Sequence, residues 1–479
     1  MHSPILGQSY VARSVNAADN RMVNLFPEAT PENGQSAGFL NRAPGLRLLA
    51  TIGTGPIRGL WTHENNGDKA YVVSGNEVYK ITAAYTPTLL GTISGTGPVS
   101  IADNGYQIAF VSNPNMYIYN ETTNSYAQVT DPDFAGAATI SYIDGYFVFN
   151  QPNTQILWVT EPLDGTVINP LAFAAAESTP DNVLAVMSNN RETWVFGSST
   201  IEVWYDAALT PFPLSPIQGA YNEIGCAAAF SIAKLDNGLF WLGADSRGFG
   251  IVYRNNGYTA VRISTHAVEY AIQGYAVISD AIAYTYQQEG HAFYVLTFPT
   301  ANATWVYDVA TGSWHERGAY VKGEFKRHRS NCQMSFNQEI IVGDYENGNI
   351  YAFDLDVYAD NGAVQKWLRS WRALPTGTNN LNRTAQHTLQ LNAETGVGIN
   401  NGQGSDPQVM LRWSDDGGHT WSNEHWTSMG KIGTYGTRAF WRRLGMTVKL
   451  RDRVYEVSGT DPVKISIIGA ELILSGSSS

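Results

Sequence analysis

Cysteine and charge are both scarce in this sequence. The 479 residues include two cysteines, Cys226 and Cys332, and neither belongs to a Cys-x-x-Cys pair. Two cysteines are too few for a disulfide framework, so we expect both to be small buried residues in a reducing compartment. Charged residues make up 15% of the chain, against roughly 25% in an ordinary soluble domain. The folded protein must therefore have a surface that is poor in charge.

Long apolar segments are missing as well. No run of 18 apolar residues occurs, and residues 1–20 lack a basic stretch followed by an apolar core. A membrane-spanning helix needs about 20 apolar residues, and a secretory leader needs that basic and apolar order. We therefore expect a protein that is made in the cytoplasm and is not inserted in a membrane.

Aromatic residues are abundant instead. They form 12% of the chain, with 26 Tyr and 13 Trp. Protein interfaces are depleted in charge and enriched in aromatics, so a Tyr-rich surface with little charge favours association. We expect an obligate assembly.

The net charge of −12 argues against a nonspecific nucleic-acid binder. Such binding depends on Lys and Arg displacing counterions from phosphates. An acidic wall can still let DNA slide past, because it repels phosphates. The charge is uneven: from Lys366 to Arg453, twelve Lys or Arg stand against six Asp or Glu, which gives +6 there and leaves −18 on the rest.

Short runs rich in Tyr, Val, Ile, Phe and Trp recur between Gly, Asn, Asp and Pro residues, and long helical periodicity is almost absent. This pattern is typical of strands joined by tight turns. Strand–turn–strand units recur about every 45 residues, the period of four-stranded propeller blades. The units lie at residues 69–80, 108–119, 145–159, 193–205, 238–253, 291–308 and 339–353. The sequence predicts an all-β chain with a β-propeller of about seven blades.

The sixth unit carries a further propeller signal. Trp305-Val-Tyr-Asp308 followed by Thr311-Gly-Ser-Trp314 resembles the kelch blade pattern, whose aromatic residues pack between blades. A hairpin in a β-sandwich is the alternative interpretation of such a unit.

The composition changes after Pro375. Residues 376–383 are polar, and residues 396–404 are rich in glycine, as is typical of loops. Strand-like runs resume after them, which indicates a small β-sandwich. The predicted division is an N-terminal arm over residues 1–54, a β-propeller over 55–380 and a C-terminal β-sandwich domain over 381–479.

One motif matches a known turn completely. Ser414-Asp-Asp-Gly-Gly-His-Thr-Trp421 has the Asp-box pattern Ser-x-Asp-x-Gly-x-Thr-Trp. We expect Asp416 to accept hydrogen bonds from the amides of the turn, Gly418 to supply an unusual backbone angle and Trp421 to anchor the hairpin in the core. Sialidases carry several such boxes. A single box without an arginine triad, a tyrosine nucleophile and an acid favours a structural turn made by Ser414, Asp416, Gly418, Thr420 and Trp421.

No other motif predicts catalysis or a bound cofactor. Gly34-Gln-Ser-Ala-Gly38 has the letters of a nucleophile elbow, but that elbow needs a strand before it and a helix after it. No phosphate-binding loop occurs. The nine histidines are scattered, and His328, four residues before Cys332, has no further ligand pair. We predict no catalytic, cofactor-binding or metal site.

Two basic groups are candidate interface residues. Because a partner subunit is itself acidic, salt bridges between subunits or rings are favoured over DNA contact. The first group is Lys326, Arg327 and Arg329; the second is Arg442 and Arg443, with Arg438, Lys449, Arg451 and Arg453 nearby in the sequence.

Three regions of the chain, in the same order, resemble the packaged-DNA-stabilisation proteins, the tail hubs or nozzles of short-tailed bacteriophages. Residues 21–59 are similar to the opening of these proteins. Residues 196–202 are similar to a signature of a blade in the middle of their chain. Residues 414–421 and 441–445 are similar to their C-terminal domain. The segments are Arg21-Met-Val-Asn-Leu-Phe-Pro27, Gly38-Phe-Leu-Asn-Arg-Ala-Pro-Gly-Leu46 with Arg58-Gly59, Phe196-Gly-Ser-Ser-Thr-Ile-Glu202, Ser414 to Trp421, and Trp441-Arg-Arg-Leu-Gly445.

The resemblance implies a structural virion protein without catalytic residues or cofactors. It implies a homo-hexamer below a dodecameric head-to-tail adaptor, in the virion tail, assembled in the bacterial host cytoplasm. The ring would hold the packaged genome, carry a plug or needle and tail spikes or fibres, and conduct double-stranded DNA without sequence-specific binding.

Two alternatives remain open at the level of the sequence. A propeller glycosidase acting on host polysaccharide would need a pocket at the propeller axis with at least two converging carboxylates. A lectin-like adhesin would need shallow aromatic-lined sites and no ring.

Overall fold

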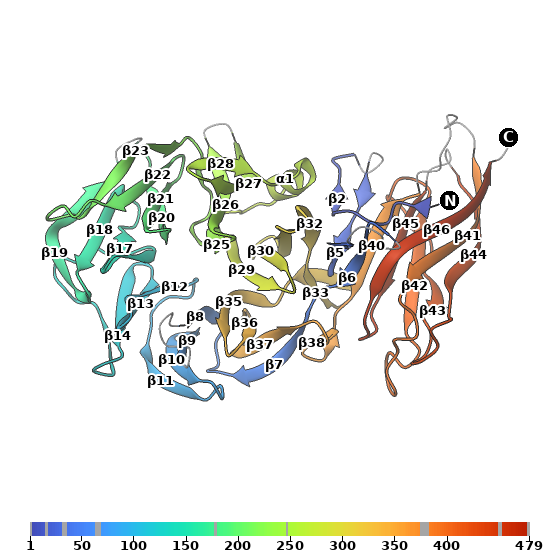
Figure 1. Ribbon diagram of the computed structural model, residues 1–479, viewed down its shortest axis with the longest axis horizontal. Helices are drawn as coiled ribbons and strands as arrows, with labels where there is room; N and C mark the ends of the chain where they lie inside the picture. Colours follow the sequence, from blue (N-terminus) through green and yellow to red (C-terminus); the bar gives the residue numbers. More distant parts are fainter. Residues whose placement is uncertain are drawn as a thin grey trace.

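The structure, a computed structural model, is built almost entirely of β-strands (Figure 1). It describes residues 2–14, 18–30, 36–62, 69–176, 180–245, 248–373, 383–448 and 453–476. Within these residues there is one α-helix, α1 (His266–Gln273), and one 3-10 turn, η1 (Ala229–Ser231). No helix of the described ranges is long and apolar enough to cross a bilayer. The all-β prediction is confirmed.

Seven antiparallel sheets of the described chain follow one another around an axis and form the blades of a propeller (Figure 1). Blade one has β8 (Ile57–Thr62), β9 (Lys69–Ser74), β10 (Glu77–Thr82) and β11 (Pro87–Thr92). Blade two has β12 (Ser100–Asp103), β13 (Gln107–Ser112), β14 (Asn115–Asn120) and β15 (Ser125–Gln128). Blade three has β16 (Ile140–Ile143), β17 (Tyr146–Asn150), β18 (Ile156–Glu161) and β19 (Asp164–Ala175). Blade four has β20 (Val183–Asn189), β21 (Glu192–Gly197), β22 (Ile201–Asp206) and β23 (Leu214–Asn222).

The remaining blades are less regular. Blade five begins with two short strands that share one partner: β24 (Gly225–Cys226) and β25 (Ala233–Leu235) both pair with β26 (Gly238–Asp245), which is followed by β27 (Gly248–Asn256) and β28 (Thr259–Arg262). Blade six has β29 (Ile282–Gln288), β30 (His291–Phe298), β31 (Ala303–Asp308) and β32 (Ser313–Glu316). A separate hairpin, β33 (Gly318–Val321) and β34 (Glu324–Arg327), leads to β35 (Ser330–Phe336), β36 (Glu339–Asp344) and β37 (Asn349–Asp354) of blade seven.

The ring of blades is closed by the beginning of the chain. Blade seven takes its fourth strand from β7 (Gly45–Thr51), which pairs antiparallel with β37. Two short strands, β38 (Ala359–Asp360) and β39 (Ala363–Val364), continue this sheet beyond β7. The first and last blades are therefore tied together by hydrogen bonds between segments about 300 residues apart in sequence.

The kelch-like residues pack between blades as predicted. The Trp314 side chain is fully buried, and its indole N–H donates a hydrogen bond to the carbonyl oxygen of Ile263 at 2.9 Å. Trp305 lies in the same hydrophobic cluster, which includes Phe240 and Val252 of blade five. Large flat side chains fill the wedge between twisted blades, which explains the regular return of Trp and Tyr along the chain.

The C-terminal residues form a β-sandwich, as predicted. One sheet contains β44 (Ala439–Met446), β41 (Thr384–Ala393), β46 (Ser466–Gly476), β6 (Gly38–Arg42) and β5 (Leu25–Ala29), with β1 (His2–Ser3) pairing β46. The other contains β43 (His425–Ser428), β42 (Gln408–Ser414), β45 (Val454–Gly459), β40 (Trp367–Arg372) and β4 (Met22–Val23). Trp367, Trp371, Trp441 and Tyr455 lie in the core between the sheets. A further pair, β2 (Tyr10–Val11) and β3 (Asp19–Asn20), stands apart from both sheets.

Propeller and sandwich share one sheet. Strand β4 pairs in parallel with β32 of blade six, through Val23 and Glu316, and antiparallel with β40 of the sandwich. The result is a nine-stranded sheet that runs from β29 to β43. Strand pairing therefore crosses both predicted domain limits: strands before residue 54 belong to both bodies, and β40, which lies before residue 380, is a strand of the sandwich.

Candidate functional site

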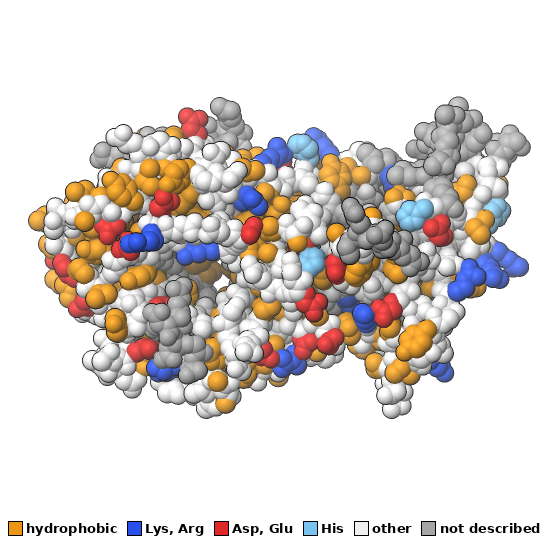
Figure 2. All heavy atoms as spheres, viewed as in Figure 1, with side chains coloured by type: hydrophobic (Ala, Val, Ile, Leu, Met, Phe, Trp, Pro, Cys, Tyr) orange, Lys and Arg blue, Asp and Glu red, His pale blue; other side chains and the backbone are white. Residues whose placement is uncertain are grey.

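The inner strands of the seven blades enclose a central cavity, visible as a hollow in the propeller (Figure 2). The cavity has a volume of about 600 Å³ and is lined by residues of β8, β12, β16, β20, β25, β29 and β35. Much of the lining is aliphatic, with Leu60, Ile101, Ile140, Val186 and Ile282 among it. Its volume is that of a small-molecule pocket.

This cavity is too small to conduct duplex DNA. The major groove of B-DNA alone is about 12 Å wide, and the two grooves together are about 16 Å deep. A cavity of about 600 Å³ that aliphatic side chains enter has no room for such a cylinder. A DNA passage built from this protein would have to lie between subunits.

The cavity also lacks the carboxylate arrangement that the glycosidase alternative needs. Among its described lining residues, the acids are Asp103 and Asp144. Asp103 accepts a hydrogen bond from the indole N–H of Trp61 at 2.7 Å, and Asp144 pairs with Arg191 at 3.0 Å. No group of three or more potential metal ligands occurs among the described residues. Both lining acids are thus held by intramolecular partners.

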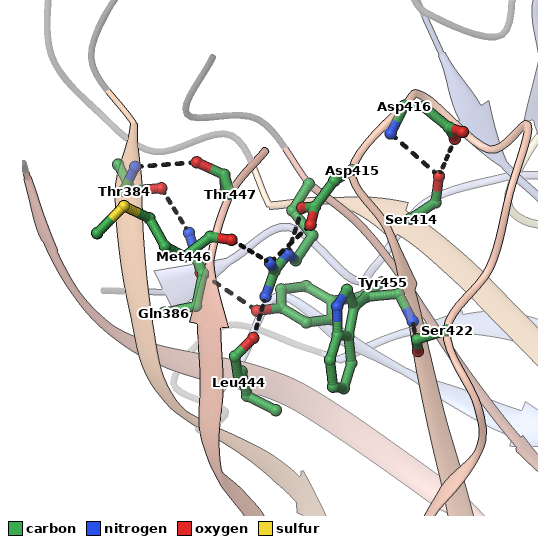
Figure 3. A network of polar contacts seen from close by, with 12 residues as sticks. Thr384, Gln386, Ser414, Asp415, Asp416, Ser422, Leu444, Met446, Thr447 and Tyr455 are labelled. Carbon is green, nitrogen blue, oxygen red and sulfur yellow. Dashed lines mark hydrogen bonds and ion pairs between the residues drawn. The ribbon is translucent and has the colours of Figure 1, made fainter. Parts of the chain in front are cut away.

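The Asp-box forms a self-contained turn at the end of β42 (Figure 3). Asp416 accepts hydrogen bonds from the hydroxyl groups of Ser414 and Thr420, both at 2.6 Å, and from the Thr420 amide at 2.9 Å. These donors hold the pKa of the Asp416 carboxyl well below its usual range. Gly418 has φ +102, a backbone angle that disfavours a side chain. The turn's hydrogen bonds are local, and its role is structural.

Trp421 differs from the prediction. It is half-buried instead of lying in the core, and the Arg412 guanidinium stacks on its ring at 4.7 Å from the centroid. Arg412 is in turn paired with Glu456 at 2.6 Å. The turn also touches the N-terminal segment, since a Cβ added to Gly418 would lie 2.3 Å from a carboxylate oxygen of Asp19. The sandwich core is filled by Trp367, Trp371 and Trp441, and Trp421 covers a salt bridge at the edge.

The first basic group is mostly engaged within the chain. Arg327 is 6% exposed and stacks on Tyr345, with the guanidinium carbon 3.6 Å from the ring centroid. Arg329 lies 3.4 Å from Asp344, and Lys326 pairs with its strand neighbour Glu324 at 2.7 Å. Lys326 is the most accessible of the three, but it is half-buried and already paired, so the structure leaves little of this group for an interface.

The second basic group lies on the sandwich. Arg442 and Arg443 are both exposed, and Arg442 stacks on Phe440 at 4.5 Å from the ring centroid. Arg453, by contrast, is 2% exposed and forms an ion pair with Asp415 at 2.7 Å, so it is a core residue. Lys449 and Arg451 lie outside the described residues. The two basic groups are on different sheets and are not brought together.

The residues that join the two bodies fall in the N-terminal segments singled out by the resemblance. Arg21 makes a two-bonded pair with Glu316, at 3.0 and 2.9 Å. The Asn24 side chain donates to the carbonyls of Gly318 and Lys366, at 2.8 and 2.7 Å. Contacts of these two side chains between the bodies were not predicted from the sequence. The sequence feature that could have revealed these contacts is a polar residue, Arg21 or Asn24, among apolar strand residues, because a buried polar side chain needs a hydrogen-bond partner.

Arg42 and Arg58 are buried arginines that also join separate segments of the chain through hydrogen bonds; we call such a residue a latch. Arg42, 3% exposed, donates to the carbonyls of Asp461, Val463 and Tyr358, at 2.7 to 3.0 Å. Burial lowers the pKa of Arg42 to about 10. Arg58 donates to the carbonyls of Gly75 and Gly97 and to the Ser112 hydroxyl, which joins blades one and two. Each arginine satisfies several loop carbonyls with one rigid group.

The sequence matches two family models, one for each body. A model described as bacteriophage P22 Gp10, beta-propeller, matches residues 1–358, and one described as bacteriophage P22 Gp10, beta-sandwich, matches residues 367–474. The chain belongs to the bacteriophage P22 Gp10 family. Members of this family are phage structural proteins linked to the stabilisation of packaged DNA, which places the chain among virion tail components and confirms the resemblance.

Solved structures similar to this family member are propellers of diverse proteins. They include the Pan2 WD40 domain of Neurospora crassa, which is 8% identical in sequence. The match covers 62% of this chain and 89% of that chain, with a TM-score of 0.42. Virginiamycin B lyase from Staphylococcus aureus is 12% identical, and the match covers 62% of this chain and 94% of that chain with a TM-score of 0.42. The extracellular domain of the putative one component system BT4673 from B. thetaiotaomicron is 10% identical. That match covers 86% of this chain and 58% of that chain, with a TM-score of 0.42. No curated protein sequence matches the chain.

Proposed function

We propose that this phage structural protein is the subunit of a tail hub or nozzle. Six copies form a ring below a dodecameric head-to-tail adaptor, retain the packaged DNA and conduct it during ejection. The observation that carries the proposal is that both bodies match the same family, in order, over residues 1–358 and 367–474.

Two features of the fold support a ring with a shared channel. The cavity of each propeller is too small for a duplex, so conduction requires a passage between copies. The nine-stranded sheet and the Arg21, Arg42 and Asn24 contacts join propeller and sandwich through many hydrogen bonds. A subunit whose two bodies are held rigidly together is suited to a ring that resists the pressure of the packaged genome. Spikes or fibres and a plug or needle are the further partners of the proposed hub.

The test is the assembly state of the purified protein, alone and with the adaptor ring of its own virion. Native mass spectrometry would count the copies, and negative-stain images would show the symmetry. A sixfold ring with a central opening, formed on the adaptor, is the expected result. A chain that stays monomeric and ignores the adaptor would overturn the proposal.

The enzyme alternative receives no support from the described residues. The two acids of the propeller cavity are held by Trp61 and Arg191, and the Asp-box is a local turn. The family is structural, which favours a protein that is not an enzyme.

A further inference from the structure

Nearly all of the net charge of the protein is carried by blades two to four and the segments beside them. Residues 81–233 contain thirteen Asp or Glu and a single cation, Arg191, which gives −12, the same as the net charge of the entire chain. The rest of the protein is therefore neutral as a whole. Arg191 is itself paired with Asp144. This part of the propeller has almost no cation with which to meet an acidic partner.

The outer strands of blades three and four are also unusually apolar on their exposed side. Strand β19 uses six more residues than β18 over their pairing, in two register shifts, and β23 uses three more than β22, so both form bulges. Large hydrophobic side chains that are 38% to 67% exposed gather here: Leu163, Val167, Leu171, Phe173, Tyr205, Leu209 and Tyr221. Figure 2 shows hydrophobic and acidic side chains over these blades, at the left end. We name this surface, with Asp133, Glu161 and Glu223, the acidic rim.

The outer sheet of the sandwich carries the opposite charge. On β44, Phe440 lies between Arg438 and Arg442, with guanidinium carbons 5.8 and 4.5 Å from its ring centroid. A register shift between β41 and β44 falls beside Arg443, whose φ is +59. The bulge places two consecutive arginines on the exposed side, where strand alternation would bury one of them.

These arginines have apolar neighbours, and the acid on the same side of the sheet, Glu471, pairs with His2. No described acid lies within ion-pair distance of Arg438, Arg442 or Arg443. Met446 is 41% exposed and Ile473 is 62% exposed on the same sheet. We name these residues, with Phe440, the basic face. Figure 2 shows a group of Lys and Arg side chains at the right end of the molecule, where Figure 1 places β41 and β44.

We infer that the basic face of one copy binds the acidic rim of the next copy, which rests on the proposed ring. The two surfaces lie at opposite ends of the folded molecule, so the contact is heterologous, the kind that generates a ring when the rotation closes. Each surface combines exposed apolar side chains with an excess of one sign of charge, and the two signs are opposite. An interface with an apolar and aromatic centre and complementary charges is both stable and selective.

Duplex DNA is the weaker occupant for the basic face. DNA is bound through phosphates, which cations neutralise and exposed apolar side chains do not. Met446 and Ile473 would be buried against phosphates at a cost, whereas the Leu and Phe residues of the acidic rim would pack on them.

The test uses charge reversal on the full chain. The basic-face variant is Arg442→Glu with Arg443→Glu, and its matched control is Lys322→Glu with Lys431→Glu. The rim variant is Asp133→Lys with Glu161→Lys, and its control is Asp356→Lys with Glu424→Lys. Asp133 and Glu161 have no side-chain bond to any other described residue, so the rim variant should fold normally. Thermal unfolding and circular dichroism check the folding of all four proteins.

The readout is the number of copies on the adaptor, measured by native mass spectrometry, and the protein concentration at half assembly. Each reversed variant alone is expected to raise that concentration at least tenfold, and the controls to change it less than twofold. An equimolar mixture of the two reversed variants should restore the ring, because acidic and basic surfaces then alternate.

The other outcomes separate the two ideas. Rings formed by both reversed variants at wild-type concentrations would overturn the inference and leave the proposed hub intact. If Arg442→Glu with Arg443→Glu assembles normally but loses salt-dependent binding of a 30-base-pair duplex, the basic face contacts DNA and the inference is wrong. A wild-type chain that forms no ring at any concentration, with or without adaptor, would overturn both.

Discussion

Arg453 and Asp415 form a buried two-bonded ion pair beneath the Asp-box, with nitrogen–oxygen distances of 2.7 and 2.9 Å. The same guanidinium donates to the carbonyl of Leu444 at 2.7 Å, and Figure 3 shows Asp415 and Leu444 converging on it. The Arg453 side chain is 1% exposed. The pair joins the loop after β42 to the end of β44, and so fixes the edge of the sandwich next to the basic face.

Removing Asp415 should therefore destabilise the sandwich strongly. Asp415→Ala leaves a buried guanidinium without its anion, which costs about 3 to 5 kcal/mol when one partner of a buried pair is removed. Urea unfolding followed by tryptophan fluorescence would measure the loss. Arg443→Ala, on the exposed side of β44, is the control and should change the free energy of unfolding by less than about 0.5 kcal/mol. Equal effects of the two substitutions would contradict the assigned role.

The Arg42 latch should couple propeller and sandwich unfolding. Arg42→Met removes donors from the carbonyls of Asp461, Val463 and Tyr358, and each unsatisfied buried acceptor costs about 1 to 3 kcal/mol. The expected result in calorimetry is a lower melting temperature for the sandwich and two separated transitions. Arg42→Lys should not restore the wild-type trace, because an ammonium cannot span these carbonyls as a planar guanidinium does. Full rescue by Lys would argue against the latch.

The Asp-box should contribute stability only while Asp416 is ionised. Hydrogen bonds from Ser414 and Thr420 hold the folded-state pKa of Asp416 below the ordinary value of an aspartate. A lowered folded pKa gives stability that is present above the unfolded pKa and is lost as the pH falls through the folded pKa. Asp416→Asn should therefore be less stable than wild type at pH 6.

The difference in stability between wild type and Asp416→Asn should shrink as the pH is lowered from 4 towards 2. Urea midpoints of wild type and Asp416→Asn at several pH values would follow it. Asp356→Asn, an exposed position outside the turn, is the control. A wild-type advantage that is constant from pH 6 to pH 2 would contradict the ionised turn.

Cys226 should be unreactive in the folded protein. Burial raises the pKa of its thiol to about 11, and the thiol donates to the carbonyl of Ala228 at 3.0 Å. Since the thiolate is the reactive form, a disulfide reagent at pH 8 should not modify the folded Cys332→Ser variant. The same variant in 6 M guanidinium chloride is the control and should react fully. Rapid reaction without denaturant would show that blade five opens in solution.

The strand pattern made the architecture predictable. The return of aromatic strands every 45 residues or so indicated the blades, and Trp305 and Trp314 pack between two of them as expected. A strand buried on both sides has to be apolar along its length, whatever it pairs with, so local composition carries this information. The Asp-box hydrogen bonds were also predictable, because all of their atoms lie within residues 414–421.

The interface candidates were less predictable. Arg327, Arg442, Arg443 and Arg453 look alike in the sequence. The fold buries Arg327 and Arg453 against Tyr345 and Asp415 and leaves the other two exposed on a bulge. A bulge depends on the register of two strands, and a buried arginine depends on partners that are distant in sequence. Neither has a local signature.

The sequence by itself determined the all-β fold, the recurring blades, the acidic charge of blades two to four and the family. Composition and short-range periodicity carry these properties, because they depend on neighbours along the chain. The tertiary structure alone decided that β7 closes the propeller, that β4 joins it to the sandwich and that the acidic rim and the basic face lie at opposite ends. These relations join segments some 300 residues apart, and backbone hydrogen bonds, which any sequence can form, establish them.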